Sequence, residues 1–368
     1  MSPSAAKPKI LLFGLPDPSS QQSLEDVAEV TIIPRKPYDE TVQNIARAVK
    51  EHGPFIAFGF TITIDEMYLY AWTKEMLEPL APECKCYCRM GAGYDMIDVE
   101  YITSTGAYFA NAPVAPSSAT AEGALALLLQ TMKAIGPQEK RLRSGQWGDF
   151  KIRTLDWKTA TVCLTVHLTI ADPTPDLSMI ACFPLMRYTQ IGIVGLGNLG
   201  SNLARMCSAL GFKVVYNTRS PRADVPYEHV PLEGLWARSD AIVLACPLTS
   251  STRGLVCKDT IARMKDGVIL VNVSRGPVVV EDDLVEALNS GKVLRAALDV
   301  FEHEPQVHPG LLANPDVTLT PHCAAGFDVA GLHGIIEMVD NVVAFIKTGR
   351  PNTPVNEREL NTGGKLAN

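Results

Sequence analysis

The stretch Gln190–Arg205 reads QIGIVGLGNLGSNLAR, and it indicates the fold of the chain. Four residues of strand-forming character, Ile191–Val194, run directly into three glycines spaced as Gly195-x-Gly197-x-x-Gly200. A helical apolar pattern follows, and a second strand, KVVY at residues 213–216, comes after it. Strand, glycine turn, helix and strand in this order form the βαβ unit that binds a dinucleotide.

Each glycine of the turn has its own physical task in such a unit. Gly195 permits the tight turn, Gly197 lets the backbone approach a pyrophosphate, and Gly200 lets the helix and the strand pack closely. The helix N-terminus then offers unpaired N–H groups and a partial positive charge to the phosphates. A tight turn between any strand and helix can look similar, so the prediction depends on the whole βαβ context.

The end of the second strand indicates which dinucleotide binds. An Asp or Glu there would bond the ribose hydroxyls of NAD, but residues 216–222 read YNTRSPR, and Asp224 lies too far beyond the strand. Arg219 and Arg222 could clamp a 2′-phosphate through charge-assisted hydrogen bonds. We therefore predict NADP as the preferred cofactor and NAD as the alternative, in which the two arginines form a solvated surface loop.

Composition limits the class of protein. The 368 residues are enough for two domains, each with its own core, and 46% apolar and 20% charged residues are typical of a globular enzyme. A formal net charge of −7 argues against nucleic acid or an anionic membrane as the main partner. The nine cysteines lack zinc-site spacing, and neither a signal-like start nor an apolar span is recognisable, so we expect a cytoplasmic protein without a metal.

The first hundred residues predict a second, smaller α/β unit. Strand patterns at residues 10–13, 27–33, 55–58 and 84–88 alternate with helical patterns at residues 40–50 and 67–80, as in a parallel sheet. The last of these strands opens into Arg89-Met-Gly91-Ala-Gly93-Tyr-Asp95. Bare backbone N–H groups at the carboxyl end of a parallel strand could hold an anion there, although a plain strand-to-helix turn would look the same.

We predict an α/β protein with two Rossmann-like or flavodoxin-like parallel-sheet domains and an inter-domain cleft. The substrate domain is expected at residues 1–114 with 328–360, the dinucleotide-binding domain at 115–327, and a disordered tail at 361–368. Residues 161–190 show neither helical nor alternating periodicity, which is atypical inside a compact domain. Two hypotheses stay open for them: a genuine additional lobe, or a retained intron, since Val162-Cys163 and Gln190 can be encoded by splice-like GTATGT and CAG.

Three strand patterns downstream of the glycine turn each deliver polar residues at the carboxyl end. The strand at residues 268–272 leads to Arg275, the strand at 296–298 leads to Asp299 and Glu304, and the strand at 317–320 leads to His322. In a doubly wound sheet this edge is where ligands bind. The sequence therefore predicts that these side chains belong to one site.

On these motifs the chain resembles the D-isomer-specific 2-hydroxyacid dehydrogenase family, which includes glyoxylate and hydroxypyruvate reductases. The resemblance covers most of residues 85–330, and it is carried by GAGYD at 91–95, the glycine turn, VNVSRG at 271–276, LDVFEHEP at 298–305 and TPH at 320–322. It implies that Arg275 holds the substrate carboxylate and polarises the carbonyl, and that His322 is the general acid/base with Glu304 as its partner. It further implies that Asp299 lies near the nicotinamide and that amides of residues 91–93 bind the carboxylate.

The chemistry of these side chains suits those roles. Reduction of a 2-oxo acid needs a hydride donor, a proton donor and a cation for the carboxylate, and a nearby carboxylate favours a charged imidazole. Arginine offers a planar fork that lysine cannot reproduce. Taken singly, His322 could be a structural histidine, Glu304 a turn acid and Arg275 a surface charge. The neighbouring Glu302, His303 and His308 are predicted to be solvated.

The functional prediction is an NAD(P)H-dependent reductase of a small 2-oxo acid, acting as a homodimer. An NAD-linked dehydrogenase for a bulkier acid and a dinucleotide-sensing, corepressor-like binding protein are the alternatives. The expected cofactor-binding residues are Gly195, Gly197, Asn198, Leu199, Gly200, Thr218, Arg219, Ser220, Arg222, Cys246, Pro247, Thr252, Val273, Ser274, Arg275, Asp299 and His322, and the expected substrate-binding residues are Gly91, Ala92, Gly93, Arg275 and His322.

Overall fold

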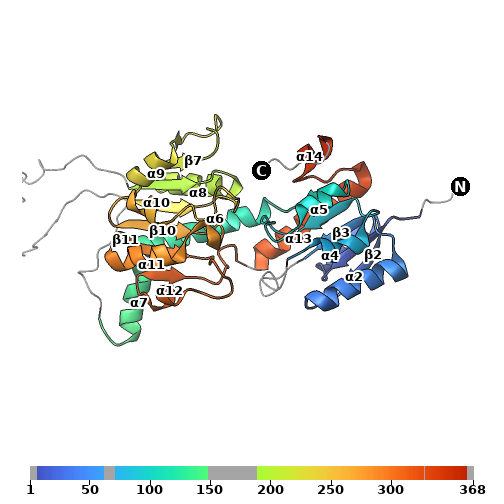
Figure 1. The fold of residues 1–368 in the computed structure, drawn as a ribbon, viewed down its shortest axis with the longest axis horizontal. Coiled ribbons are helices and arrows are strands. Elements are labelled where there is room, and N and C mark those ends of the chain that lie inside the picture. The colour runs from blue at the N-terminus through green and yellow to red at the C-terminus, as the bar shows by residue number, and fades with distance from the viewer. Residues whose placement is uncertain (1–5, 62–70, 148–188, 327, 363–368) are drawn as a thin grey trace, which may run out of the picture. The chain divides into compact units, whose positions relative to one another are not determined.

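The computed structural model describes residues 6–61, 71–147, 189–326 and 328–362 (Figure 1). Apart from its last two residues, the predicted insert at 161–190 lies outside the described residues, and so does the tail from residue 363 onward. The chain divides into two compact units, which we call unit 1, residues 1–123 with 322–368, and unit 2, residues 124–321. Domain boundaries at 114/115 and 327/328 stay a prediction from the sequence.

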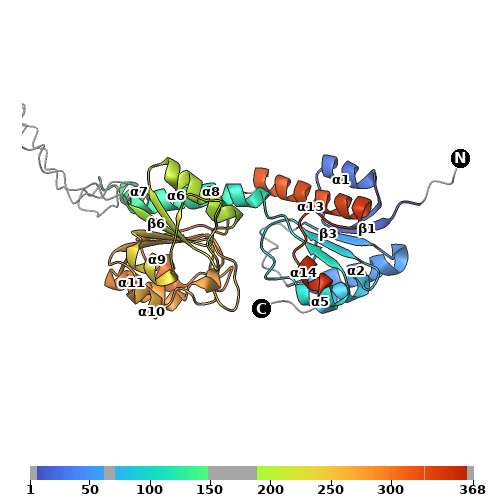
Figure 2. The ribbon, with the colours of Figure 1, turned by 90° about the horizontal axis from the view of Figure 1, so that it is seen from above.

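Unit 1 contains a five-stranded sheet in which all neighbouring strands are parallel. In the order β2-β1-β3-β4-β5, its strands are Glu29–Ile33, Lys9–Phe13, Ala57–Phe60, Cys86–Arg89 and Tyr108–Ala110. One face is covered by α1 (Pro18–Glu25) and α13 (Asp328–Thr348), and the other by α2 (Tyr38–His52), α4 (Lys74–Leu77) and α5 (Val99–Ser104), as Figure 2 shows. The short helix α14 (Glu357–Asn361) includes the first residue of the predicted disordered tail.

The core of unit 1 follows from the two-residue alternation along β1. Ile10 and Leu12 pack with α1 and α13, whereas Leu11 and Phe13 pack with the helices of the opposite face, and all four are at most 1% exposed. Strands covered on both faces are expected to be apolar on both sides. Burial of each such side chain stabilises the fold by about 1.5–3 kcal/mol.

One predicted helix of unit 1 differs from the structure in its described part, residues 71–80, while residues 67–70 lie outside the described residues. Residues 67–80 were expected to be helical, but Trp72 forms an isolated parallel bridge with Ile97, and α4 begins only at Lys74 and continues as a 3-10 turn at Glu78–Leu80. The indole is 2% exposed and stacks on Phe60 with ring centroids 4.8 Å apart. Filling this part of the core places the backbone in an extended conformation, so packing overrides local helix propensity.

Unit 2 contains a seven-stranded parallel sheet in the order β12-β11-β10-β9-β6-β7-β8. The strands in chain order are β6 (Gln190–Val194), β7 (Lys213–Asn217), β8 (Glu228–His229), β9 (Ala241–Leu244), β10 (Val268–Asn272), β11 (Val293–Leu298) and β12 (Val317–Leu319). From β6 the chain first proceeds to β7 and β8 on one side and then to β9 on the other. The topological switch point therefore lies between β6 and β9.

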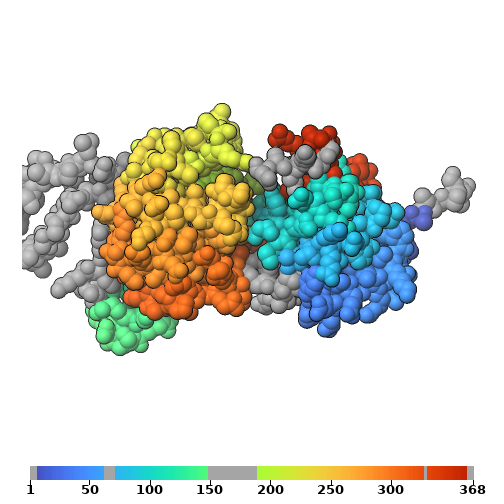
Figure 3. Space-filling view, in the orientation of Figure 1, coloured from blue at the N-terminus to red at the C-terminus, as the bar shows by residue number. Residues whose placement is uncertain are grey.

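Helices cover both faces of this sheet as well. Figure 2 shows α6 (Ala115–Met132), within which the chain passes from unit 1 to unit 2, and α8 (Asn198–Ala209) on one face, with α9 (Leu232–Arg238), α10 (Lys258–Ala262) and α11 (Glu281–Ser290) on the other. Helix α12 (Pro309–Ala313) precedes β12. Helix α7 (Ile135–Arg143) stands out from the surface of unit 2 in the space-filling view (Figure 3).

The two parallel sheets with helices on both faces confirm the predicted α/β class. Among the described residues, no helix combines the length and the apolar content needed to cross a membrane. Over the same part of the chain, no group of three or more His, Cys, Asp or Glu side chains is arranged to hold a metal ion.

Candidate active site

The glycine turn of unit 2 has two close approaches and one open position. Gly195 has a φ of +96°, and a Cβ on it would lie 2.7 Å from Ala245 O. A Cβ on Gly200 would lie 2.0 Å from Gly195 O, so only glycine lets α8 approach the end of β6 this closely. Gly197, the N-cap of α8, is exposed, with no described protein atom within 4 Å of its Cβ position. This open side at a helix start fits the phosphates of a dinucleotide.

The predicted cofactor-binding residues of unit 2 follow five strands that are neighbours in the sheet, β11-β10-β9-β6-β7. After β9, Thr252 Oγ1 donates to Pro247 O at 2.6 Å and accepts from Thr249 N–H at 2.8 Å, which closes that loop on itself. After β7, Thr218 Oγ1 donates to Ser220 O at 2.6 Å. All five loops leave from the carboxyl edge of the sheet, which is the ligand-binding edge of such folds.

Arg222 has a structural role that the sequence did not indicate. Its Nη1 donates to Leu196 O at 2.7 Å and to Ser201 Oγ at 3.0 Å, so the guanidinium contacts the glycine turn and the first turn of α8. Its Nε donates to Asp224 Oδ1 at 3.0 Å, and this bond lowers the pKa of the Asp224 carboxyl. Arg219 is exposed. Both arginines were predicted to clamp a 2′-phosphate. The hydrogen bonds of Arg222 instead hold its loop against the glycine turn.

A buried amide shapes the loop that carries Arg275. Asn272, the last residue of β10, is 0% exposed, and its Oδ1 accepts hydrogen bonds from Ser274 N–H at 3.0 Å and Ser274 Oγ at 2.7 Å. Its Nδ2 donates to Arg275 O at 3.0 Å. The half-buried guanidinium of Arg275 donates from Nη1 to Ser274 O at 2.8 Å. Asn272 belongs to the VNVSRG motif at residues 271–276, but the sequence analysis assigned no role to it.

Asp299 and Glu304 follow β11, the neighbour of β10. Asp299 is 2% exposed, and its Oδ1 accepts from Thr320 Oγ1 at 2.6 Å, which joins the ends of β11 and β12. Its backbone N–H donates to Asn272 O at 3.0 Å. Glu304 is half-buried, and its Oε1 accepts from Phe301 N–H at 2.8 Å. Arg275, Asp299 and Glu304 therefore leave from adjacent strand ends of unit 2 that are hydrogen-bonded to one another.

The prediction that the neighbours of Glu304 are solvated was wrong for Glu302 and His308, because both make defined contacts. Glu302 is half-buried, and its Oε2 accepts from Glu281 N–H at 3.3 Å at the start of α11. His308 Nε2 lies 2.9 Å from Asp282 Oδ1, and its Nδ1 accepts from Gly310 N–H at 3.0 Å. The loop after β11 folds onto α11, a long-range contact without a local sequence signal. His303 is exposed.

His322 follows β12 and has an uncommon backbone conformation. It is half-buried, and its φ of +52° lies in the left-handed region. Such a conformation costs a residue other than glycine of order 1–3 kcal/mol, and residues of this kind gather at functional sites. His322 opens the second segment of unit 1, whereas Arg275 and Glu304 belong to unit 2. The pairing of His322 with Glu304 stays a prediction.

The glycine loop after β4 has its carbonyl groups held by protein donors. Gly91 O accepts from Ala112 N–H at 3.1 Å, Ala92 O accepts from Asn111 Nδ2 at 2.7 Å, and Gly93 O accepts from the buried Arg89 guanidinium. In a trans peptide the N–H points opposite to the C=O. The N–H groups of Ala92 and Gly93 therefore point away from these partners, as an anion-binding loop requires.

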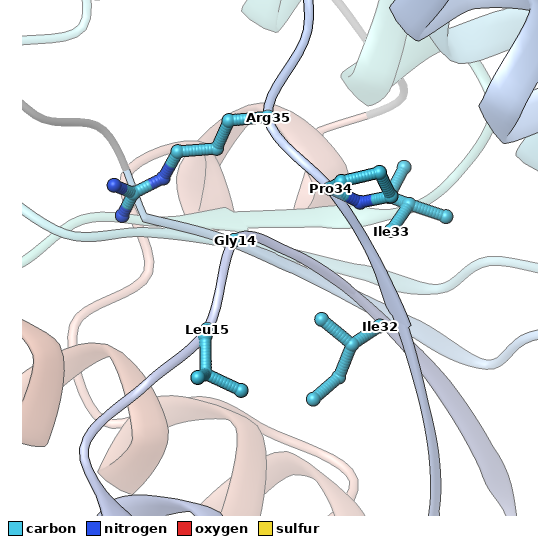
Figure 4. Close-up of a pocket in the computed structure, with 6 residues that line it drawn as sticks. All are labelled: Gly14, Leu15, Ile32, Ile33, Pro34 and Arg35. Carbon is cyan, nitrogen blue, oxygen red and sulfur yellow. The ribbon is translucent and has the colours of Figure 1, made fainter.

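Unit 1 also has a pocket of about 470 Å³ at the carboxyl ends of β1 and β2. It is lined by Gly14, Leu15, Ile32, Ile33, Pro34 and Arg35, and in Figure 4 the side chains of Leu15 and Ile32 lie on one side of Gly14 with the guanidinium of Arg35 on the other. Arg35 Nη2 donates to Thr61 Oγ1 at 2.8 Å. No sequence motif indicated this pocket.

Comparison with known proteins identifies the family. Residues 183–324 match the family described as "D-isomer specific 2-hydroxyacid dehydrogenase, NAD binding domain". A glyoxylate reductase of Thermococcus onnurineus is 35% identical over 286 residues, which cover 76% of this chain and 79% of that protein. The chain belongs to the D-isomer-specific 2-hydroxyacid dehydrogenase family. It is therefore an oxidoreductase of this type with a nicotinamide-dinucleotide domain.

Solved structures of the family agree with the fold. A glyoxylate reductase from Paecilomyes thermophila has a TM-score of 0.80 and 27% identity, covering 96% of this chain and 99% of that one. An NADPH-dependent glyoxylate/hydroxypyruvate reductase from Sinorhizobium meliloti, solved with NADP and malonate, has a TM-score of 0.72 and 26% identity, covering 99% and 100%. The resemblance that the motifs indicated is thus confirmed for the family and for the fold.

Proposed function

We propose that this member of the 2-hydroxyacid dehydrogenase family reduces a small 2-oxo acid, such as glyoxylate or hydroxypyruvate, to the D-2-hydroxy acid, with a preference for NADPH. The observation that carries the proposal is the convergence of Arg275, Asp299 and Glu304 on adjacent strand ends of the sheet that bears the dinucleotide turn. The similarity to a glyoxylate reductase and to an NADPH-dependent glyoxylate/hydroxypyruvate reductase supports the substrate class.

Each residue has one task in the proposed reaction. Arg275 binds the substrate carboxylate with its planar guanidinium and polarises the adjacent carbonyl, and the N–H groups of Ala92 and Gly93 bind the same carboxylate. His322 donates a proton to the carbonyl oxygen, and Glu304 orients the imidazole. When bound, the reduced nicotinamide supplies the hydride for the carbonyl carbon.

The preference for NADPH is proposed from the end of β7. No carboxylate follows this strand before Asp224, and Asp224 is paired with Arg222. Arg219 is the exposed cation of the loop, so we assign it the contact with a 2′-phosphate. The NADPH dependence of the Sinorhizobium relative supports the same choice.

The direct test follows the absorbance of NADPH and NADH with the full chain and three substrates: glyoxylate, hydroxypyruvate and a bulky 2-oxo acid. We expect faster oxidation of NADPH than of NADH and higher kcat/KM for the two small acids. Preference for NADH and the bulky acid would support the NAD-linked alternative. Cofactor binding without turnover on any of them would refute the proposal and support a dinucleotide-sensing protein instead.

We also propose that the enzyme acts as a homodimer in the cytoplasm. The surface of α7 and the turn after it supports association, because Ile135, Leu142 and Trp147 are 52%, 57% and 81% exposed. Large apolar side chains gathered on one protruding element are typical of an interaction surface.

A further inference from the structure

We infer that Glu281 is a positioning residue for Glu304. The Glu281 side chain fixes the peptide unit between Phe301 and Glu302, and Phe301 in turn holds the Glu304 carboxylate through its N–H group. The inference rests on the proposed function, in which Glu304 orients the proton donor. Glu281 is the first residue of α11, and its described hydrogen bonds are with Glu302, which is not among the residues proposed to meet the substrate.

The peptide unit between Phe301 and Glu302 is held at both of its polar ends. Its N–H, on Glu302, donates to Glu281 Oε1 at 2.8 Å. Its carbonyl oxygen, on Phe301, faces Gly276, where a Cβ would lie only 1.7 Å away. Gly276 directly follows Arg275, the residue proposed to bind the substrate carboxylate. The loop of Arg275 therefore packs directly against this peptide. Rotation of the peptide would break the first contact or collide at the second.

The residue that provides this carbonyl also holds Glu304. Phe301 N–H donates to Glu304 Oε1 at 2.8 Å, and the Phe301 ring is 5% exposed in the core of unit 2. With its ring buried and its following peptide fixed, Phe301 has little freedom to reorient its N–H. The chain of contacts from Glu281 through Glu302 N–H and Phe301 N–H therefore ends at the Glu304 carboxylate.

Glu281 and Glu302 contact each other reciprocally. Glu302 Oε2 accepts from Glu281 N–H at 3.3 Å, and the N-cap residue Val280 provides no side-chain hydrogen bond to this helix end. Glu302 thus caps α11 while Glu281 holds the loop. Glu281 is 5% exposed, and a buried carboxyl is costly unless it is hydrogen-bonded. The partial positive charge at the start of α11 offsets part of that cost.

Three variants of the full chain separate positioning from a general loss of structure. Glu281→Ala removes the acceptor, Glu281→Gln keeps a neutral acceptor of the same length, and Glu286→Ala is the matched control on the exposed side of α11, where Glu286 pairs with Lys258. Because displacement of a catalytic group by about 1 Å can cost up to a hundred-fold in rate, we expect Glu281→Ala to lower kcat about ten-fold. Cofactor affinity should stay within about two-fold, and the other two variants should retain near-normal kcat.

A double-mutant cycle with Glu304→Gln gives the decisive comparison. If Glu281 acts through Glu304, adding Glu281→Ala to Glu304→Gln should lower kcat no further, since coupled residues are not additive. Additive losses, or a Glu281→Ala enzyme with normal kcat, would overturn the inference. Should Glu281→Ala fail to fold, Glu281→Asp, which is shorter by one methylene, takes its place in the cycle.

Hydrogen exchange provides a readout that does not depend on turnover. Backbone amides of residues 299–304 should exchange faster in Glu281→Ala than in the wild type and at the wild-type rate in Glu281→Gln, because only the alanine variant frees Glu302 N–H. Unchanged exchange in Glu281→Ala would refute the contact on which the inference rests. A wild type that is inactive on every 2-oxo acid but shows this exchange pattern would refute the proposed function alone.

Discussion

Arg275 depends for its position on the buried side chain of Asn272, three residues earlier. Asn272→Ala removes three hydrogen bonds inside the loop and leaves buried groups without partners, so the free energy of unfolding should fall by about 1–3 kcal/mol. KM for the 2-oxo acid should rise as Arg275 loses its orientation. Chemical denaturation and steady-state kinetics measure both effects, with the exposed Asn352→Ala as a control expected to change neither.

Arg219 and Arg222 should respond differently to the same substitution. Arg219→Asp places a carboxylate where the 2′-phosphate is proposed to bind, so the ratio of kcat/KM for NADPH to that for NADH should fall at least about ten-fold. Arg222→Asp breaks the bonds to Leu196 and Ser201 and should lower Tm and weaken both cofactors. Arg205→Asp, an exposed change on α8, is the control. An unchanged ratio in Arg219→Asp would contradict the NADPH assignment.

Glu281 should make stability depend on pH. Burial raises the pKa of its carboxyl above the usual 4.5, and this effect exceeds the lowering by the hydrogen bond from Glu302 N–H, while the charge of the Glu302 carboxylate adds to the rise. The folded state then holds the proton more tightly than the unfolded chain, so this stabilisation is present below pH 4.5 and is lost as pH rises through the raised pKa. Glu281→Gln cannot titrate, and its Tm relative to wild type should increase between about pH 4 and pH 7. A difference that stays constant with pH would show that Glu281 has no shifted pKa.

At the scale of elements, Gly200 and Gly276 allow close approaches of the backbone, whereas Gly197 leaves open space. A Cβ on Gly200 or Gly276 would meet backbone at 2.0 Å or 1.7 Å, so alanine at either position should lower Tm. A Cβ on Gly197 meets no described protein atom within 4 Å, so Gly197→Ala should fold normally. Its methyl group would instead occupy the space of the pyrophosphate and weaken cofactor binding, as fluorescence titration can measure. Normal cofactor affinity in Gly197→Ala would contradict the placement of the phosphates.

The elements that the sequence predicted correctly are those with a local cause. The βαβ unit around the glycine turn was predictable because its turn, helix start and apolar strand are encoded within a few residues. The strands before Arg275 and Asp299 were predictable because buried parallel strands are largely apolar runs. The helix expected at residues 67–80 was partly wrong because Trp72 is placed by aromatic packing against distant residues, which no local pattern encodes.

The contacts that organise the site were not predictable for the same reason. Glu281 and Glu302 are separated by 21 positions, and their mutual hydrogen bonds depend on how the loop after β11 meets α11. Asn272 was part of a recognised motif without an assigned role, yet its side chain makes three hydrogen bonds in the loop of Arg275. Sequence motifs identified residue types suited to the chemistry. The supporting contacts became visible only in the folded structure.

At the scale of the whole molecule, the proposed association can be tested through α7. Leu142 is 57% exposed and Trp147, just after the helix, is 81% exposed. If this surface joins two copies, light scattering should give twice the mass of one chain, and Leu142→Arg should give monomers at micromolar concentration. Lys140→Ala, an exposed change on the same helix, should keep the dimer. A monomeric wild type would contradict the proposal.

The loop at residues 91–93 has a consequence for how strongly the enzyme would prefer a 2-oxo acid over its ester. Three carbonyl groups are engaged by donors of unit 1 without any ligand, so the orientations of these peptide units, and of the N–H groups on their opposite sides, are set in advance. In the proposed reaction, a carboxylate would accept charge-assisted hydrogen bonds from these N–H groups, whereas the methyl ester of the same acid is neutral and would bind more weakly. Part of the discrimination between an acid and its ester would then come from the backbone of this loop, in addition to the part that the Arg275 guanidinium provides.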